Sequence, residues 1–195
     1  MSTNIETLRW IGDHNGHLIL IDQTRLPVEL VDHECRTVET AWEAIKQLRV
    51  RGAPAIGIAA AYGTVLGLQN ASLLDKTGFG GALNQVTGYL AESRPTAVNL
   101  LWAHDRPKAQ GHSLPESLSL DEKRAALLAE ARAIHDEDRE LCRSIGRHGA
   151  ELLKHNSGVL THCNAGGLAT AEYGTALSVF FTALTIYAIP HAALG

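Results

Sequence analysis

Apolar and polar positions alternate in a β-like way at the start of the chain and recur at helical spacing afterwards. Two short apolar runs flank the turn-rich residues 12–16, which predicts a β-hairpin over residues 8–23. A further apolar run predicts a third short strand at residues 28–31. Residues 37–48 then carry apolar side chains at helical spacing behind Thr37, a predicted N-cap, and this pattern predicts a helix with one apolar face.

The middle of the chain is predicted to be mainly helical. Further helices are expected over residues 54–63, 82–93, 96–106 and 120–156. They are separated by a glycine-rich break at residues 72–81 and by residues 107–119, whose Pro, Gly, Ser and Gln content without apolar periodicity predicts a mobile loop. The charge run at residues 136–140 is expected to lie largely on the solvated face of its helix.

The pattern changes again near the C-terminal end. Residues 158–163 form a short apolar run typical of a buried strand, and residues 164–170 are a glycine turn expected to lead into a helix. A strand, a glycine turn and a helix make the first half of a β-α-β unit, in which ligands gather at the carboxyl end of the strand. The sequence therefore predicts an α+β chain, with a β-hairpin and helical domain over residues 1–156 and the start of a second domain over residues 157–195.

Composition narrows the classes of function. The 195 residues are 45% hydrophobic and 19% charged with a formal net charge of -4, as in a soluble globular protein, and the lack of a basic excess argues against a nucleic-acid partner. Three widely spaced cysteines, ten scattered histidines and no export signal indicate a cytoplasmic protein without disulfides or a zinc site. The uncharged residues 173–195 have the length of a membrane span, but no basic flank or aromatic belt supports insertion, so no membrane segment is expected.

Arg51, Gly52 and Ala53 precede Pro54, which suits the first turn of a helix because its φ is already helical and it lacks an N–H group. The free N–H groups and the positive dipole end of that helix, together with the arginine, predict an anion site with phosphate as its natural occupant. The alternative is a small-residue helix in a tight core, with Arg51 in a surface ion pair. Arg94 lies in a similar turn before a proline, so the two arginines can converge on one phosphate, although either alone is more often a solvated surface residue.

Cys163 occupies the carboxyl end of the strand predicted at residues 158–163. An adjacent helix N-terminus lowers the pKa of a thiol and favours the reactive thiolate, so Cys163 is the candidate catalytic residue. For a lone cysteine the alternative is a small core residue. Cys35 and Cys142 lie among apolar positions and are interpreted as structural.

Three blocks of the sequence carry a family resemblance: Arg51-Gly52-Ala53-Pro54-Ala55-Ile56-Gly57, Arg94-Pro95-Thr96-Ala97-Val98-Asn99-Leu100 and Leu160-Thr161-His162-Cys163-Asn164-Ala165-Gly166. They resemble signature blocks of the methylthioribose-1-phosphate isomerases, a family in the superfamily of the α, β and δ subunits of eukaryotic initiation factor 2B. The blocks follow the family's order, and the similarity runs from about Leu8 to Leu177.

The resemblance implies a cytoplasmic, homodimeric enzyme of methionine salvage that converts 5-methylthioribose 1-phosphate to 5-methylthioribulose 1-phosphate without a metal or redox cofactor. It also implies that Arg51, Gly52, Ala53 and Arg94 bind the substrate phosphate and sugar, and that Cys163 assists proton or hydride movement at the sugar carbons. A thiol in a water-poor pocket can act as an acid, as a base or as a stabiliser of enolate-like charge. The residues leave these three roles open.

The fold implied by the resemblance is a mainly helical N-terminal domain with a small β-hairpin sheet, followed by the first strand and helix of an incomplete Rossmann-like domain. Family members are longer, and their second half supplies an aspartate that acts as general acid. The tail from about Ser178 does not resemble the family, so a C-terminally truncated form with partial or no activity is expected. The alternatives are a non-catalytic sugar-phosphate-binding or regulatory protein of the same superfamily and a ribose 1,5-bisphosphate isomerase.

Overall fold

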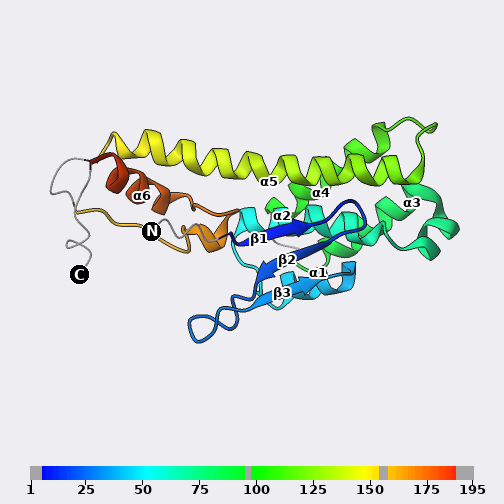
Figure 1. Ribbon diagram of the computed structural model, residues 1–195, viewed down its shortest axis with the longest axis horizontal. Helices are drawn as coiled ribbons and strands as arrows, with labels where there is room; N and C mark the ends of the chain where they lie inside the picture. The colour runs from blue at the N-terminus through cyan, green and yellow to red at the C-terminus, as the bar shows by residue number, and fades with distance from the viewer. Residues whose placement is uncertain (1–5, 95–97, 154–157, 188–195) are drawn as a thin grey trace.

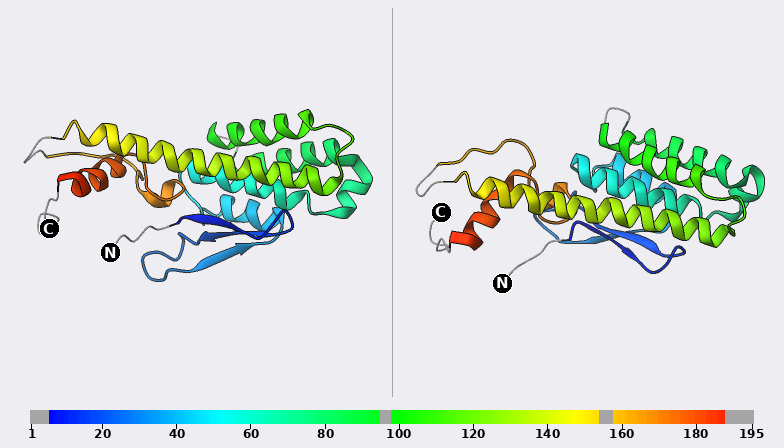
Figure 2. Two further views of the ribbon diagram at one scale, coloured as in Figure 1. Left: turned by 45° about the horizontal axis from the view of Figure 1, so that its top comes forward. Right: turned by 90° about the horizontal axis from the view of Figure 1, so that it is seen from above.

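The structure is a computed structural model that describes residues 6–94, 98–153 and 158–187. In chain order its elements are β1 (Leu8–Ile11), β2 (His17–Ile21), β3 (Asp32–Cys35), α1 (Val38–Lys46), α2 (Ala53–Gly67), α3 (Ala71–Ala91), α4 (Val98–Ser113), α5 (Leu120–Ala150), the 3-10 helix η1 (Gly167–Ala169) and α6 (Ala176–Tyr187). Helices dominate, and the described strands form a small antiparallel sheet (Figure 1), as expected for the predicted α+β class. α5 runs along the molecule with the sheet on one side and α4 on the other (Figure 2).

The sheet confirms the predicted hairpin. Its order is β1-β2-β3, and both neighbouring pairs are antiparallel. Leu8 pairs with Leu20, and Leu18 pairs with Cys35. These four side chains are fully buried in the same core as α2, so one face of the sheet covers that helix.

The third strand starts later than the sequence pattern predicts. Residues 28–31 are not a strand, and β3 forms at Asp32–Cys35 instead. Val28 and Leu30 are 86% and 74% exposed, whereas Cys35 is fully buried. The prediction from the apolar run was wrong because the register with β2 places Cys35 opposite Leu18, and burial of that pair decides which residues join the sheet.

α2 lies at the centre of the fold. It contacts α1, α3, α4, α5, the first two strands and η1, and every residue from 55 to 67 is buried. A Cβ on Gly67 would lie 2.5 Å from the side chain of Val86 in α3, and one on Gly63 would lie 3.2 Å from Leu90. The small residues of α2 therefore allow its neighbours to approach closely, and this packing offsets the cost of glycine inside a helix.

Two helices begin with hydrogen-bonded capping boxes. At the predicted N-cap of α1, the Thr37 hydroxyl accepts from the Thr40 N–H while the Thr40 hydroxyl accepts from the Thr37 N–H. Ser119 and Glu122 make the same pair of contacts at the start of α5. Reciprocal caps of this kind stabilise the first turn, and both helices start where the sequence predicts.

α3 confirms the helix predicted at residues 82–93 but also extends through residues 72–81, which we predicted as a break. The irregularity there is confined to Gly78, whose φ of 67° and ψ of 174° are non-helical. Glycine accepts this left-handed backbone without a Cβ clash, so the chain kinks and resumes the helix. Residues 95–97, which include the predicted start of the next helix, lie outside the described residues.

α4 continues past Pro107, so the mobile loop predicted at residues 107–119 is wrong for its first half, and only residues 114–119 are irregular. Proline removes a hydrogen bond from a helix and is locally unfavourable. Tertiary packing overrides that preference, because Pro107 and Gly111 are both buried. A Cβ on Gly111 would lie 2.4 Å from the Leu83 side chain of α3, which shows how closely the two helices pack.

The strand predicted at residues 158–163 is not formed, since residues 158–166 are neither strand nor helix. This removes the first strand of the expected Rossmann-like unit from the structure. A strand needs a partner for its N–H and C=O groups, and in the described parts of the chain the paired strands all belong to the sheet β1-β2-β3. The helix expected from residues 164–170 is reduced to the turn η1, and the next α-helix begins at Ala176.

α6 packs against the C-terminal part of α5 (Figure 1). Two glycines of α5 make this contact close. A Cβ on Gly146 would lie 2.4 Å from Thr182 Oγ1, and one on Gly149 would lie 2.4 Å from the Val179 side chain. The segment that follows Cys163 therefore ends in α6, which is packed closely against α5.

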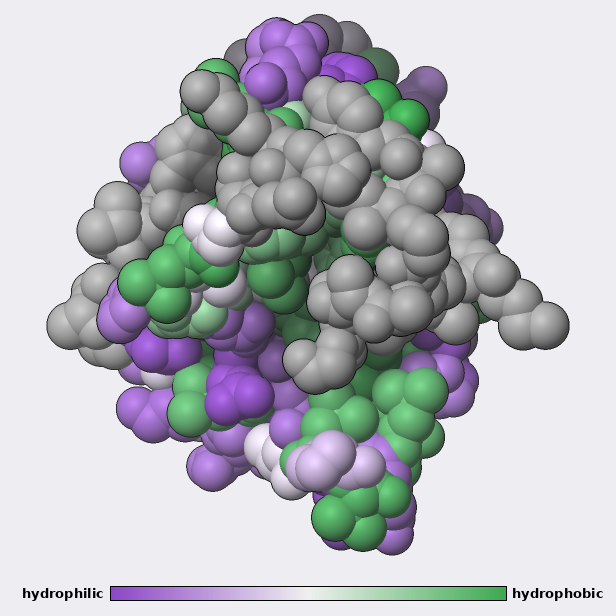
Figure 3. Space-filling view, turned by 90° about the vertical axis from the view of Figure 1, so that its left-hand side faces the viewer, coloured by the Kyte–Doolittle hydropathy of each residue, from purple (hydrophilic) through white to green (hydrophobic). Residues whose placement is uncertain are grey.

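The end of the molecule that carries α6 has a mixed surface. In Figure 3, apolar residues in green lie beside polar residues in purple over this end. Among the described residues after 150, the exposed large apolar side chains are those of Leu152, Val159, Leu160, Phe181 and Ile186. Within the described ranges, no helix combines the length and the apolar composition that a membrane crossing requires.

Candidate functional site

Ion pairs hold the chain just before α2. Leu48, directly after the C-cap of α1, has a left-handed φ of 63°. Arg49 then pairs with Glu43 (Nε to Oε2, 2.8 Å) and with Asp22 (Nη1 to Oδ2, 2.5 Å). The hydrogen bond from Arg49 holds the pKa of the Glu43 carboxyl below its usual value. This anchor fixes the backbone from which Arg51 projects two residues later.

The N-terminus of α2 is the predicted anion site. Gly52 is the N-cap, with a φ of 97°, and no side chain caps the first turn. Arg51 and Ala53 are exposed. The alternative in which Arg51 makes a surface ion pair is not supported, because no described carboxylate pairs with it. The positive end of the helix dipole and the exposed guanidinium of Arg51 are therefore features that attract an anion.

The turn η1 packs directly on this helix end. A Cβ on Gly52 would lie 2.4 Å from both the Cα and the carbonyl oxygen of Ala169, so the two backbones touch and only glycine fits. The buried Gln23 side chain donates to the Leu168 carbonyl (2.7 Å), and the Thr7 hydroxyl donates to the Gly167 carbonyl (2.7 Å). The segment after Cys163 is thus tied to the end of β2 and to the residues before β1.

Asp138 of α5 holds the same segment from the other side. Its Oδ2 accepts a hydrogen bond from the Ala171 N–H at 2.7 Å. Burial raises the pKa of this carboxyl. The neighbouring Asp136, Glu137 and Glu140 are exposed, which confirms the solvated face predicted for most of the charge run, whereas Asp138 and Arg139 are half-buried.

The other two predicted site residues are Cys163 and Arg94. Cys163 is exposed, with a left-handed φ of 66°, and the described chain after it leads into the short turn η1 and not directly into an α-helix. Arg94 is half-buried just after α3 and borders residues 95–97, which lie outside the described chain. Among the described hydrogen bonds and ion pairs, none joins Arg51, Arg94 and Cys163. Of the predicted site residues, Gly52 is therefore the one that is packed against the segment following Cys163.

The other two cysteines are buried, as their structural interpretation predicts. Burial raises the pKa of the Cys35 thiol to about 12 and that of Cys142 to about 11. Both thiols stay protonated near neutral pH and are poor nucleophiles. No group of three or more His, Cys, Asp or Glu side chains in the described residues is arranged to hold a metal ion.

A cavity of about 330 Å³ opens beside the first turns of α2. It is lined by Pro54, Gly57 and Ile58 of α2 and by Ile134, Glu137, Asp138 and Leu141 of α5. Its walls are mostly apolar, with the half-buried Asp138 carboxyl at one side. An anion held at the α2 N-terminus would place an apolar substituent within reach of this cavity, because successive helix turns rise by about 5.4 Å.

We expect Asp138→Ala to destabilise the chain by about 1–3 kcal/mol, because it leaves the Ala171 N–H without its acceptor. Asp138→Asn keeps an oxygen acceptor and removes a half-buried carboxyl, so its free energy of unfolding should stay within about 1 kcal/mol of the parent. Urea unfolding and amide exchange at Ala171 measure both effects. Equal losses in the two variants would mean that the hydrogen bond is not what holds the segment.

The sequence analysis missed Gln23 and Asp138. The position of Asp138 on the inner face of α5 could have been recognised from the sequence. It lies four residues after Ile134 and four before Cys142, and both of these residues are buried. A carboxylate on the apolar face of a helix needs a partner. Gln23 carried no such signal, since its acceptor lies 145 residues away in the sequence.

Comparison with known proteins identifies relatives of about twice this length. The chain is 51% identical over 177 residues to a 5-deoxyribose 1-phosphate isomerase of Moorella thermoacetica, and the match covers 91% of this chain and 50% of that protein. It is 48% identical over 183 residues to a methylthioribose-1-phosphate isomerase of Rhodopirellula baltica, covering 90% of this chain and 50% of that protein. The chain thus spans about half the length of these relatives.

Two crystal structures share the fold. One is the translation initiation factor eIF-2B subunit delta from A. fulgidus, with a TM-score of 0.80 and 39% identity over 94% of this chain and 52% of that chain. The other is 5-methylthioribose 1-phosphate isomerase from Pyrococcus horikoshii, with a TM-score of 0.81 and 35% identity over 94% of this chain and 50% of that chain. A model of the initiation factor 2 subunit family matches residues 49–185, which is more than half of the sequence. The chain therefore belongs to the initiation factor 2 subunit family.

Proposed function

We propose that this chain binds the phosphate of a pentose 1-phosphate at the N-terminus of α2 and takes part in an aldose–ketose isomerisation. The observation that supports this most directly is the uncapped first turn of α2 with the exposed Arg51, against which the segment following Cys163 is packed. Free N–H groups, a helix dipole and a guanidinium are the features that bind phosphate. Arg94 is assigned as a second cation for the same ligand. The relatives are by name isomerases of ribose 1-phosphates altered at C5, which supports a pentose 1-phosphate as the substrate class.

The substrate we propose is 5-methylthioribose 1-phosphate, converted to 5-methylthioribulose 1-phosphate in cytoplasmic methionine salvage. The apolar cavity beside Gly57 and Ile58 supports a substrate that lacks a polar group at C5. A methylthio group has more apolar surface to bury there than the methyl group of 5-deoxyribose, at about 25 cal/mol for each Å² removed from water. We therefore expect the methylthio substrate to bind more tightly.

The reaction needs no external oxidant, because substrate and product are isomers. The bond between C1 and the ring oxygen breaks, the hydrogen on C2 moves to C1, and the C2 hydroxyl becomes a carbonyl while its proton passes to the former ring oxygen. The phosphate stays on C1 throughout. Arg51 and the first turn of α2 would hold that phosphate, which fixes C1 and C2 in the site. We assign Cys163 to the transfer of hydrogen between these two carbons.

The proposal is tested by turnover of the 195-residue chain with 5-methylthioribose 1-phosphate. We expect Cys163→Ala to lose turnover and to keep binding. Arg51→Ala should weaken binding about 10- to 100-fold, because a charged hydrogen bond contributes about 1.5–3 kcal/mol. Product formation and titration calorimetry measure the two effects separately.

Arg36→Ala is the matched control for Arg51→Ala. Arg36 is exposed and pairs with Glu34 of β3, so its removal should leave binding and turnover unchanged. An equal loss of binding in both arginine variants would show that net charge, and not a phosphate site on α2, attracts the ligand.

A sugar-phosphate-binding protein without turnover is the second candidate. The similarity to the initiation factor subunit and the exposure of Cys163 favour it. Saturable binding that depends on Arg51, without product, would support this candidate over the enzyme. Folded protein that binds neither the methylthio nor the deoxy substrate would contradict both.

A further inference from the structure

Gln23 contacts both segments that carry the proposed site. It follows the end of β2 and is 4% exposed. Its backbone N–H donates to the Arg49 carbonyl at 2.9 Å, two residues before Arg51. Its side-chain Nε2 donates to the Leu168 carbonyl at 2.7 Å, five residues after Cys163. One buried residue therefore bridges the chain before α2 and the turn η1.

The side-chain amide of Gln23 has one possible orientation. The Leu168 carbonyl can accept only from the amide nitrogen, because a flipped amide would bring two oxygen atoms together. The Oε1 atom is then buried, and no described group donates a hydrogen bond to it. An unpaired buried acceptor costs about as much free energy as one hydrogen bond contributes. The amide therefore adds little net stability, and its main effect is to fix where η1 lies relative to the chain before α2.

These contacts close a ring beside the proposed phosphate site. From Gln23 the ring passes through the Arg49 carbonyl and along the backbone to Gly52. It crosses to η1 where the backbones of Gly52 and Ala169 touch, and it returns to Gln23 through the Leu168 carbonyl. The ion pairs of Arg49 anchor one side of this ring. Loss of the Gln23 amide opens the ring and leaves that anchored side in place.

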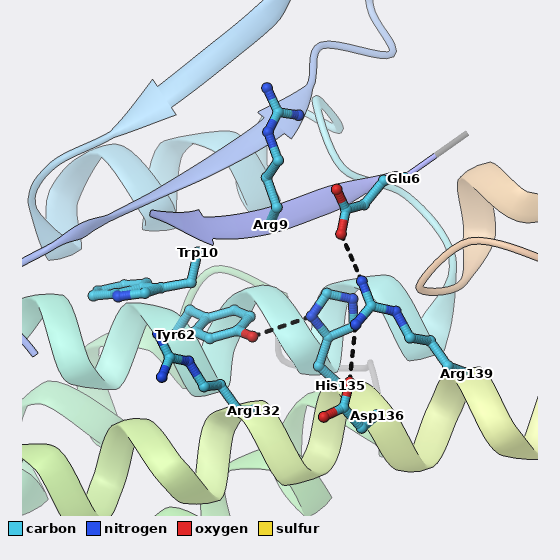
Figure 4. Close-up of a pocket in the computed structure, with 8 residues that line it drawn as sticks. All are labelled: Glu6, Arg9, Trp10, Tyr62, Arg132, His135, Asp136 and Arg139. Atoms are coloured by element: carbon cyan, nitrogen blue, oxygen red, sulfur yellow. Dashed lines mark hydrogen bonds and ion pairs between the residues drawn. The ribbon is translucent and has the colours of Figure 1, made fainter. Parts of the chain in front are cut away.

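The segment that follows Cys163 has other contacts, which tie it to different parts of the fold. The Thr7 hydroxyl and the Asp138 carboxyl hold it to the residues before β1 and to α5. Arg139 of α5 pairs in turn with Glu6 at 2.6 Å. Figure 4 shows this pair in the wall of a hollow between β1 and α5. These described contacts do not reach the chain before α2, so they cannot replace the bridge made by Gln23.

We propose that Gln23 is a positioning residue that couples the N-terminus of α2 to the segment carrying Cys163. An anion bound by Arg51 and the first turn of α2 restrains the chain before the helix. The ring passes this restraint to η1, because coupling between two sites needs continuous contacts between them. Cys163 then becomes less accessible when the anion site is filled. The bridge is a property of the fold, whereas its coupling to a ligand rests on the proposed function.

The bridge is tested by amide exchange in the 195-residue chain. Gln23→Leu keeps a side chain of similar size and the backbone hydrogen bond to Arg49, and it removes the amide. We expect exchange at Ala169 and Thr170, which bond within the turn, to become about fivefold faster or more. The urea midpoint should change little, since the unpaired Oε1 is removed together with the donor.

Gln69→Leu is the matched control. Gln69 is half-buried just after the other end of α2, and its Nε2 donates to the carbonyls of His14 and Gly16, both at 3.0 Å. The substitution therefore removes a comparable amide that bonds to backbone carbonyls at the hairpin turn. Exchange at residues 169 and 170 should be unchanged in this variant.

The coupling is tested with inorganic phosphate, which can fill the anion site but lacks the sugar. Alkylation of Cys163 by iodoacetamide is followed by mass spectrometry, and Cys35 and Cys142 are buried and react poorly. We expect saturating phosphate to slow alkylation of Cys163 about fivefold or more in the parent and in Gln69→Leu. Gln23→Leu should bind phosphate with unchanged affinity and show no slowing.

The outcomes separate this inference from the proposed function. If phosphate binds to the parent without any effect on Cys163, the coupling is contradicted and the phosphate site stands. If phosphate does not bind to the parent, the phosphate site is overturned and the coupling to a ligand with it. Equal exchange rates at residues 169 and 170 in Gln23→Leu and Gln69→Leu would overturn the bridge itself.

Discussion

Replacing Gly52 with alanine will destabilise the folded chain by about 3 kcal/mol and will release the turn η1 from α2. Two causes act together. The φ of 97° is unfavourable for any residue with a Cβ, and the added Cβ would lie 2.4 Å from the Ala169 backbone. Backbone atoms cannot rotate away as a side chain can, so either η1 or the start of α2 has to move. Urea unfolding measures the stability, and amide exchange at residues 167–171 measures the release.

Gly88→Ala is the matched control for this substitution. Gly88 lies in α3, is exposed, and has no atom within 4 Å of the position that a Cβ would take. Alanine there should stabilise the helix by up to about 1 kcal/mol. If Gly52→Ala unfolds at the same urea concentration as the parent, η1 does not pack on the end of α2. The proposed phosphate site then lacks the segment that is packed against it.

Acidification from pH 6.5 to pH 4 will remove about 3 kcal/mol of folding free energy through His135 alone. Burial, assisted by the nearby Arg139 charge, lowers the pKa of this imidazole from 6.5 to about 4. In this pH range the unfolded chain binds a proton that the folded chain does not, so stability falls as the pH falls. Asp138 acts in the opposite direction, because burial raises the pKa of its carboxyl and proton binding there favours the folded state.

The measurement is the free energy of unfolding as a function of pH. A His135→Gln variant should lose most of the slope between pH 6.5 and pH 4, because glutamine does not titrate and can still bond to the Tyr62 hydroxyl. His148→Gln serves as the control, since His148 is exposed on the same helix. Identical slopes in the two variants would show that the acid sensitivity has another origin.

Some residues of the candidate site could be predicted and others could not. Gly52 and Ala53 were recognisable as a helix start, because Pro54 and the small residues after it are local signals. The burial of Asp138 could have been inferred from its spacing on α5. The contacts of Thr7 and Gln23 with η1 had no local signal, because hydrogen bonds between residues about 150 positions apart leave no periodicity in a sequence.

The sequence by itself determined the hairpin, the cap of α1 at Thr37, the start of α2 to within one residue of Pro54 and the family membership. Turn residues, capping side chains and apolar spacing act between residues a few positions apart, so they can be recognised before the fold is known.

Only the tertiary structure decided that α4 continues past Pro107, that residues 158–166 do not form a strand, and that His135 lies buried beside Tyr62. A helix through proline depends on packing against α3, and a strand depends on a partner strand elsewhere in the chain. The buried imidazole depends on Tyr62, which comes 73 residues earlier. These features arise from contacts between distant segments, and the local pattern contains no information about which segments meet.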